Sequence, residues 1–373
     1  MRIGVPAETR AGETRVAATP DTVKRLAAKN EVRVQAGAGS GSSIPDRDYE
    51  AAGAKIVPGP AEAFDAEIIL KVRSPQEFEL ELLKGGSVLI GLLDPFNSAG
   101  LEALAKRGVT GFAMEWLPRI SRAQSMDVLS SQANIAGYKA VVLAAAEIGR
   151  FFPMLMTAAG TIKAARVLVL GAGVAGLQAI ATAKRLGAVI EASDVRPAVK
   201  SEIESLGAKF VDVPFLTDEE REIAQGVGGY ARPMPADWMR RQAEAVHQRA
   251  VQSDVVITTA LIPGRPAPRL IKDETLRQMK PGSVVVDLAA EQGGNVEGTE
   301  VGKSVVKHGV KIIGLPNLPA SVPFDASALY ARNLYNFLVL MLDPKTGEFK
   351  IDRSDEVIGG TLACADGAPV KKG

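Results

Sequence analysis

RVLVLGAGVAGLQAIATAKRLGAVIEASDVR, residues Arg166–Arg196, carries the clearest pattern of secondary structure in this chain. Val167–Leu170 is a continuous apolar run, which is typical of a strand buried on both faces of a parallel sheet. Three glycines follow, and apolar residues then recur at helical spacing before a second apolar run, Val189–Ala192. This order predicts a strand, a tight glycine turn, a helix and a second strand.

The spacing of Gly171, Gly173 and Gly176 is that of a dinucleotide-binding loop. Gly171 would allow the sharp turn, Gly173 the approach of backbone to a pyrophosphate, and Gly176 the close packing of helix on strand. The amino terminus of the helix offers unpaired N–H groups and a partial positive charge to phosphates. Asp194 is predicted to accept hydrogen bonds from the adenosine ribose, which favours NAD over NADP. Arg196 keeps the alternative open, because a guanidinium group there can accommodate a 2′-phosphate.

Composition excludes several classes of protein. A chain of 373 residues is long enough for two domains, and 46% hydrophobic with 23% charged residues is typical of a globular protein. The net charge of +1 gives no reason to expect nucleic acid or an anionic membrane surface as a partner. The single cysteine, Cys364, excludes an internal disulfide framework. His247 and His308 are too few to suggest a metal site. The longest charge-free run, Val167–Ala183, contains the three glycines, so no membrane insertion is expected.

Predicted strands and helices alternate along most of the chain, which is the pattern of a parallel α/β sheet. Strands are predicted at residues 2–5, 31–35, 55–57, 67–72, 87–93 and 109–116, and then at 166–170, 189–192, 209–213, 254–259, 283–288 and 311–314. A loop at 118–123 precedes a long helix from about Ser130 to near Gly149, and another helix is predicted at Asp325–Leu342. We therefore predict two Rossmann-like, doubly wound parallel-sheet domains with a cleft between them, the second inserted in the first. Residues 1–130 plus 318–373 would form the first domain, and residues 131–317 the dinucleotide-binding domain.

The connection at Gly226–Pro235 mixes glycines and prolines with one aromatic residue, Tyr230. A long glycine-containing excursion is either a mobile lid or a plain surface loop, and the sequence leaves both open. Oxidation of an alcohol or amine normally needs a proton acceptor beside the nicotinamide. His247, in a predicted amphipathic helix, and His308, in a turn before a strand, are each interpreted as structural rather than catalytic. Hydride transfer between two nicotinamides needs alignment and a dry site and no acid or base, so the shortage of bases favours it.

Several stretches carry a family resemblance that spans essentially the whole chain. MRIGVPAETRAGETRVAATP at residues 1–20, AGAGSGSSIPDRDYEAAGA at 36–54 and the glycine fingerprint resemble the alanine dehydrogenase/pyridine nucleotide transhydrogenase family. PRISRAQSMDVLSSQANIAGYKAV at 118–141, GGYA at 228–231 and TTALIPGRPAPRLI at 258–271 are similar to its transhydrogenase branch.

The resemblance implies an activity and its partners. This chain would bind NAD(H), and hydride would pass directly between NADH and NADP⁺ held by a partner domain. That domain belongs to an NADP(H)-binding beta subunit, and a membrane-spanning subunit would couple the step to proton translocation. The enzyme would be a Si/Re-specific NAD(P) transhydrogenase, complete only with these subunits. The resemblance further implies a homodimer in the cytoplasm, peripheral to the inner face of the cell membrane.

The resemblance also implies which residues contact the cofactor. In the first domain, the catalytic set around the nicotinamide and its ribose would be Arg119, Gln124, Asp127 and Ser130, with Ser125 and Met126 in the same loop. Gln124 would also face the incoming NADP(H). In the second domain, the pyrophosphate would meet Ala172, Gly173 and Val174 in the loop that ends at Gly176, and the adenosine ribose would meet Asp194, Val195 and Arg196. Further cofactor-contacting positions match Gly229, Gln242 and Leu261, and Tyr230 would be the tip of the lid.

Two departures from the alanine dehydrogenase branch bear on the alternatives. That branch carries a catalytic histidine at the end of the strand corresponding to residues 87–93, where this sequence reads LIGLLDPFN. Arg15 and Lys71 match positions that hold the substrate carboxylate in that branch. Without the histidine they are interpreted as structural remnants, or as a pair that binds a small anion. The alternative functions are therefore an alanine dehydrogenase-like NAD-dependent oxidoreductase and a non-catalytic NAD-binding module.

Overall fold

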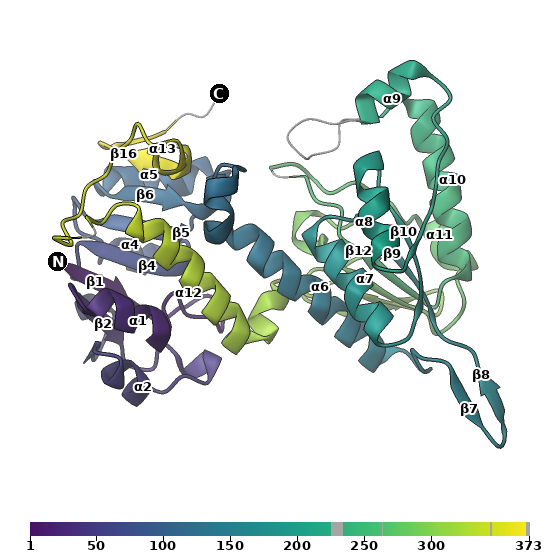
Figure 1. Ribbon diagram of the computed structural model, residues 1–373, viewed down its shortest axis with the longest axis horizontal. Helices are drawn as coiled ribbons and strands as arrows, with labels where there is room; N and C mark the ends of the chain where they lie inside the picture. Colours follow the sequence, from purple (N-terminus) through teal and green to yellow (C-terminus); the bar gives the residue numbers. More distant parts are fainter. Residues whose placement is uncertain (225–233, 263, 344, 371–373) are drawn as a thin grey trace. The chain divides into compact units, whose positions relative to one another are not determined.

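The computed structural model describes residues 1–224, 234–262, 264–343 and 345–370. The chain divides into two compact units, one formed by Met1–Gln132 with Pro319–Gly373 and the other by Ala133–Leu318 (Figure 1). We call them unit 1 and unit 2. Each contains one large, mainly parallel β-sheet covered by helices, so the predicted α/β class with two doubly wound sheets is confirmed.

The sheet of unit 2 has the strand order β11-β10-β9-β12-β13-β15-β14. Its strands are β9 (Arg166–Leu170), β10 (Val189–Ser193), β11 (Lys209–Phe210), β12 (Val255–Thr258), β13 (Val284–Asp287), β14 (Ser304–Lys307) and β15 (Val310–Ile313). All pairs are parallel except β14 with β15. From β9 the chain continues to β10 and β11 on one side of β9, and it then returns to form β12 on the other side of β9. The topological switch point therefore lies between the carboxyl ends of β9 and β12, where doubly wound proteins bind nucleotides.

The position of β9 between two hydrophobic cores explains why its sequence is continuously apolar. Val167 and Val169 pack into one core with helices α6 (Val128–Glu147), α7 (Val174–Arg185) and α8 (Lys200–Ser205). Leu168 and Leu170 pack into the opposite core with α10 (Ala236–Gln252) and α11 (Asp273–Gln278), as Figure 1 shows for the two helical layers. Each such side chain contributes about 1.5–3 kcal/mol when fully buried. A polar residue at any of these four positions would therefore face a core.

The sheet of unit 1 has the order β17-β16-β6-β5-β4-β1-β2-β3. Its strands are β1 (Arg2–Val5), β2 (Glu31–Gln35), β3 (Lys55–Val57), β4 (Ile68–Arg73), β5 (Val88–Leu92), β6 (Thr110–Ala113), β16 (Leu362–Ala365) and β17 (Ala368–Pro369). Strands β1 to β6 pair in parallel, and the two terminal strands add an antiparallel edge. The helices are α1 (Pro20–Ala27), α2 (Asp46–Ala51), α3 (Pro60–Phe64), α4 (Glu77–Leu80), α5 (Ser98–Lys106), α12 (Pro323–Val339) and α13 (Glu356–Thr361).

Helix α12 explains why the end of the chain belongs to unit 1. Its buried residues Tyr330, Leu334 and Phe337 pack into one core with Ile3, Val34 and other residues of the sheet. Figure 1 shows the helix running along that sheet. Helix α5 covers the opposite face through Leu101, Leu104 and Ala105.

The structure corrects several sequence-based boundaries. The strand predicted at 109–116 ends at Ala113, and Met114–Trp116 forms a 3₁₀ turn that lets the Glu115 carboxyl group accept N–H bonds from the end of β5. The loop predicted at 118–123 is wrong in part, because Ser121–Met126 is a 3₁₀ helix anchored by two buried side chains. The strand predicted at 209–213 pairs only at 209–210.

Three strands and one helix complete the description of unit 2. Strand β14 was not predicted, nor was the hairpin of β7 (Leu155–Thr157) and β8 (Gly160–Ile162). The hairpin projects from the rest of its unit in Figure 1. Helix α9 (Asp218–Ala224) ends where the described residues stop. Within the described ranges, no helix combines the length and apolar character that crossing a bilayer requires.

Candidate nucleotide site

The glycine loop between β9 and α7 has the geometry that its sequence predicts. Gly171 adopts a φ of +96°, and a Cβ there would lie 2.7 Å from Thr259 Oγ1. A Cβ at Gly176 would lie 1.9 Å from the carbonyl oxygen of Gly171. At Gly173, by contrast, no heavy atom of the described chain would lie within 4 Å of an added Cβ. The protein's own packing therefore requires glycine at the first and third positions, and open space remains beside the second.

That open space lies at the amino terminus of α7. Gly173 is the N-cap residue of this helix and has no side chain with which to cap the first amide groups, those of Val174 and the residues after it. These amides and the helix dipole form a favourable place for a phosphate. Lys184 and Arg185 in the last turn complement the opposite end of the same dipole.

Asp194 lies just beyond β10, and its carboxylate faces the glycine loop. Its Oδ2 accepts a hydrogen bond of 2.8 Å from the backbone N–H of Ala172. Its Oδ1 accepts bonds of 2.9 Å from the backbone N–H and from Nε of Arg196, whose Nη2 donates to Oδ2 at 2.9 Å. This pairing raises the pKa of the Arg196 guanidinium group. The carboxylate is thus fixed in orientation by the loop on one side and by the arginine on the other.

The other expected residues of unit 2 lie on elements around this edge or on α10. Leu261 follows β12 and is 41% exposed, close in sequence to Thr259, whose Oγ1 donates to the carbonyl of Gly171 at 2.9 Å. Val195 packs beside the buried cluster that contains Trp238 of α10. Gln242, on the same helix, is buried. Gly229 and Tyr230 lie outside the described residues.

The expected residues of unit 1 form one anchored loop. Ala123 and Met126 of the 3₁₀ helix are buried, whereas Gln124 and Ser125 between them are exposed. The carbonyl of Ser125 accepts bonds from Asn333 Nδ2 at 2.8 Å and from Asn336 Nδ2 at 3.0 Å, which ties the loop to α12. The side chain of Gln124 is therefore presented to solvent from a fixed backbone.

Asp127 and Ser130 interact with each other at the start of α6. Asp127 Oδ1 accepts from the backbone N–H of Ser130 at 2.9 Å, and Oδ2 accepts from the hydroxyl group at 2.6 Å. This is the geometry of a helix N-cap. A structural role therefore accounts for both side chains in this structure, whatever they contact in addition. Arg119 is exposed just before the 3₁₀ helix.

Arg15 and Lys71 are both buried, and carboxylates of the same unit neutralise them. Arg15 binds Glu13 at 2.6 Å, and Lys71 Nζ lies 2.8 Å from Glu79 and 3.4 Å from Glu8. Burial opposes ionisation of Glu13, but its bonds to Arg15 prevail and lower its pKa to about 2. A small anion would have to compete with three glutamates for these two cations.

Both histidines have partners inside unit 2. His247 Nδ1 lies 2.8 Å from Thr275 Oγ1, which joins α10 to α11, and His308 Nε2 lies 2.9 Å from Asp273 Oδ1. Within the described portion of the chain, no group of three or more His, Cys, Asp or Glu side chains could hold a metal ion.

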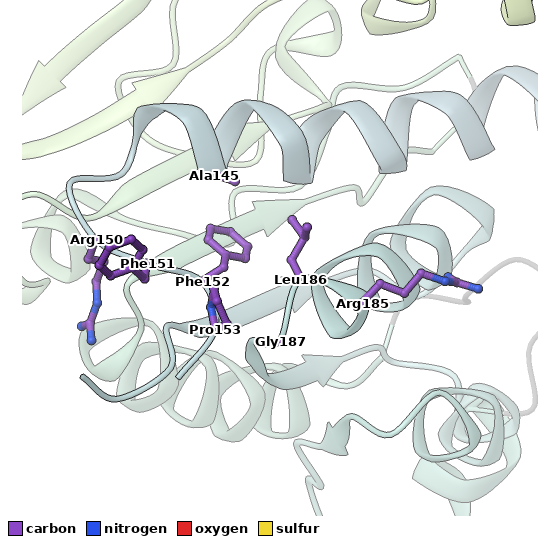
Figure 2. Close-up of a pocket in the computed structure, with 8 residues that line it drawn as sticks. All are labelled: Ala145, Arg150, Phe151, Phe152, Pro153, Arg185, Leu186 and Gly187. Atoms are coloured by element: carbon purple, nitrogen blue, oxygen red, sulfur yellow. The ribbon is translucent and has the colours of Figure 1, made fainter. Parts of the chain in front are cut away.

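A pocket lies at the opposite, amino-terminal edge of the same sheet. Its lining includes Gly187, which comes just before β10, and Phe152, whose carbonyl accepts a hydrogen bond of 3.0 Å from the N–H of Ala165, the residue before β9. In Figure 2 the guanidinium groups of Arg150 and Arg185 point away from Phe152 and Leu186. This pocket contains no residue of the glycine loop and is separate from the candidate site.

Sequence reasoning missed Thr259 and Asn295, which contact the loops at this edge. A signal existed for Asn295, because it follows a Gly-Gly pair just after a predicted strand, and the carboxyl ends of parallel strands share one edge. Its partner could not be read from the sequence.

Comparison with known proteins places both units. The family model described as "Alanine dehydrogenase/PNT, N-terminal domain" matches residues 4–136, and "Alanine dehydrogenase/PNT, C-terminal domain" matches residues 140–372. The chain is 52% identical to an NAD(P) transhydrogenase subunit alpha chain of Rhodospirillum rubrum, over 99% of this chain and 98% of that protein. A transhydrogenase structure from Sinorhizobium meliloti matches with a TM-score of 0.89 at 48% identity, covering 99% of this chain and 100% of the other. An L-alanine dehydrogenase structure matches with a TM-score of 0.80 at 26% identity, covering 99% and 97%.

Proposed function

The chain belongs to the alanine dehydrogenase/PNT family, and on that premise we propose that it is the NAD(H)-binding subunit of a proton-translocating NAD(P) transhydrogenase. The observation that carries the proposal is the carboxyl edge of the unit 2 sheet. There, open space at Gly173, the amino terminus of α7 and the fixed carboxylate of Asp194 fit a dinucleotide. The greater identity to a transhydrogenase subunit than to the alanine dehydrogenase structure supports this branch.

We propose that the site prefers NAD(H) to NADP(H). Asp194 would accept hydrogen bonds from the adenosine ribose, and a 2′-phosphate would meet its negative charge. The bonds that join Arg196 to Asp194 support this preference, because the guanidinium group is already neutralised by that carboxylate. Val195 and Arg196 would line the same region of the site.

In the proposed mechanism, hydride would pass from bound NADH to NADP⁺ held by a separate beta subunit, which leaves NAD⁺ and NADPH. Hydride transfer between two nicotinamides needs orientation and exclusion of water rather than an acid or base. The exposed side chain of Gln124 on an anchored backbone suits an orienting role toward the carboxamide. Arg119, Asp127 and Ser130 are proposed to complete this set. Leu261 and Gln242 are proposed as cofactor contacts of unit 2.

The remaining elements of the proposal concern assembly. A membrane-spanning subunit would couple hydride transfer to proton translocation, and this chain would lie peripherally on the inner face of the membrane. Two copies would form a homodimer. Exposed apolar residues on and near the β7–β8 hairpin, Met154, Met156 and Ile162, support a covered surface, since Met156 is 73% exposed.

Mixing experiments test the function directly. We expect the purified chain to bind NADH and to reduce an NADP analogue from NADH only when the NADP(H)-binding partner domain is added. Reduction of NAD by L-alanine without a partner would contradict the proposal and favour an alanine dehydrogenase-like enzyme. NADH binding without transfer in the complete mixture would favour a non-catalytic module. The end of β5, which lacks the histidine that the resemblance places there in the other branch, and the neutralised Arg15 and Lys71 argue against alanine turnover.

A further inference from the structure

Two loops at the carboxyl edge of the unit 2 sheet are joined along their length. They follow β12 and β13 and comprise residues 259–271, with 263 outside the described residues, and 288–299. Backbone bonds connect Ala267 N–H to the carbonyl of Gln292, at 2.8 Å, and Leu270 N–H to the carbonyl of Asn295, also at 2.8 Å. The two loops therefore form one platform rather than two independent segments.

The side chain of Asn295 lies at the centre of this platform with 0% exposure. Its Oδ1 accepts a bond of 3.1 Å from Ala260 N–H, and its Nδ2 donates to the carbonyls of Ala260 at 2.9 Å and of Pro268 at 2.8 Å. One acceptor and both donors of the amide are used. Asn295 therefore bonds both the N–H and the carbonyl of Ala260, as a neighbouring strand would do if β12 continued.

The place of Ala260 in the fold indicates which half of a ligand it would meet. Thr259, the residue before it, donates to the carbonyl of Gly171 across the switch point. A doubly wound sheet takes one mononucleotide half of a dinucleotide on each side of that point. Asp194, beyond β10, marks the side of the adenosine half. We therefore expect the nicotinamide mononucleotide half on the β12 side of the switch point.

The two residues that follow the anchored Ala260 are apolar and exposed. Leu261 is 41% exposed and Ile262 is 43% exposed. Two large apolar side chains held in the open at a nucleotide edge suit contact with a flat ring.

We propose that Asn295 is a positioning residue for the nicotinamide half of the bound dinucleotide. Its amide fixes Ala260 and so sets the position of Leu261 relative to Gly171. The proposal rests on the proposed function, since it presumes that unit 2 binds NADH. It predicts that Asn295 affects the two halves of the ligand unequally.

The test compares NADH with ADP, which contains only the adenosine half and the phosphates, in titrations of the full chain. Asn295→Asp keeps the size and the acceptor but replaces the Nδ2 donor with an oxygen facing two carbonyls. Asn295→Ser serves as a second, uncharged variant in case the aspartate chain does not fold. The free-energy penalty for leaving a buried polar group unpaired corresponds to a factor of about ten or more in an equilibrium constant. We therefore expect the affinity for NADH to fall by about tenfold or more, while the affinity for ADP stays within about twofold.

Thr275→Val is the matched control, because it removes another buried polar contact in unit 2, with His247, away from the platform. It should lower thermal stability without changing either affinity. An unchanged NADH affinity in both Asn295 variants would overturn the inference, and so would equal losses for NADH and ADP. If the wild-type chain binds neither ligand, the proposed function itself fails and the inference falls with it.

Discussion

The guanidinium group of Arg196 closes on the carboxylate of Asp194 through two side-chain hydrogen bonds of 2.9 Å each, from Nε to Oδ1 and from Nη2 to Oδ2. Such bidentate pairs are stronger and more directional than single contacts. Arg196, which could attract a 2′-phosphate, is thus held by Asp194, which would repel that phosphate.

This relationship predicts how cofactor preference responds to substitution. Asp194→Ser should free Arg196, weaken NADH binding by about tenfold and strengthen NADPH binding, because the carboxylate is lost and the cation is released. Titration of both cofactors measures the ratio. Arg196→Gln is the control and should keep NADH as the preferred cofactor. A ratio that does not change in Asp194→Ser would show that other residues set the preference.

The glycine loop predicts a separation of binding from folding. Gly173→Ala should fold with normal stability, since the residue has φ −76° and ψ −167° and, apart from its two neighbours in sequence, no described residue has a heavy atom within 4 Å of an added Cβ. It should nevertheless weaken NADH binding by about tenfold, because the methyl group fills the space proposed for the pyrophosphate.

Gly176→Ala is the matched comparison. Its Cβ would lie 1.9 Å from the Gly171 carbonyl, so the loop must shift and the unfolding free energy should fall by about 1–3 kcal/mol. Urea unfolding and NADH titration of both variants check the pair. Normal NADH affinity in a folded Gly173→Ala chain would argue against a pyrophosphate at this place.

Gln124 offers a test of catalysis apart from binding. Gln124→Ala should leave folding intact, because the side chain is exposed while Ala123 and Met126 hold the loop. In the mixture with the NADP(H)-binding partner, the hydride-transfer rate should fall by more than the NADH affinity does, since a lost orienting contact acts mainly in the transition state. Ser121→Ala, at the start of the same 3₁₀ helix, is the control. Equal losses in rate and affinity would contradict an orienting role.

Glu115 predicts a pH dependence of stability in unit 1. Burial raises the pKa of its carboxyl group to about 7, although bonds from the N–H groups of Leu93 and Asp94 oppose the shift. Between the unfolded value near 4.5 and about 7, the folded state binds more protons than the unfolded state, so this group stabilises less as pH rises. Compared with Glu115→Gln, the wild-type unfolding free energy should fall by roughly 1–3 kcal/mol more between pH 5 and 8. Parallel pH profiles of the two chains would refute this assignment.

The burial of the Lys71–Glu79 ion pair predicts that the two side chains are strongly coupled in their effects on the free energy of unfolding. Lys71→Met leaves the carboxylates of Glu79 and Glu8 without their cation and should cost about 3–5 kcal/mol of stability. Adding Glu79→Gln should recover some of that loss, because one unpaired charge is removed. Denaturant unfolding of the single and double variants gives the coupling energy. Additive losses would mean that the two side chains do not stabilise each other.

The main elements and the glycine loop follow from local sequence patterns. The apolar run Val167–Leu170 with the glycines after it predicts a strand covered on both faces, and the apolar spacing after Gly173 predicts a helix, because both signals lie within a few adjacent residues. The antiparallel strands β14 and β16 extend the two predicted sheets without changing their class.

Which polar groups contact one another depends on how the chain folds. In the folded chain β6 ends at Ala113, and Glu115 accepts a hydrogen bond at the end of β5. Glu79 pairs with Lys71, and Asn295 bonds to Ala260. These partners lie on different strands, helical segments or loops, and the packing of those elements brings them together. Backbone periodicity is a local property, whereas a side chain's partner depends on segments distant in the sequence. The chemistry of the edge therefore had to be found in the folded chain.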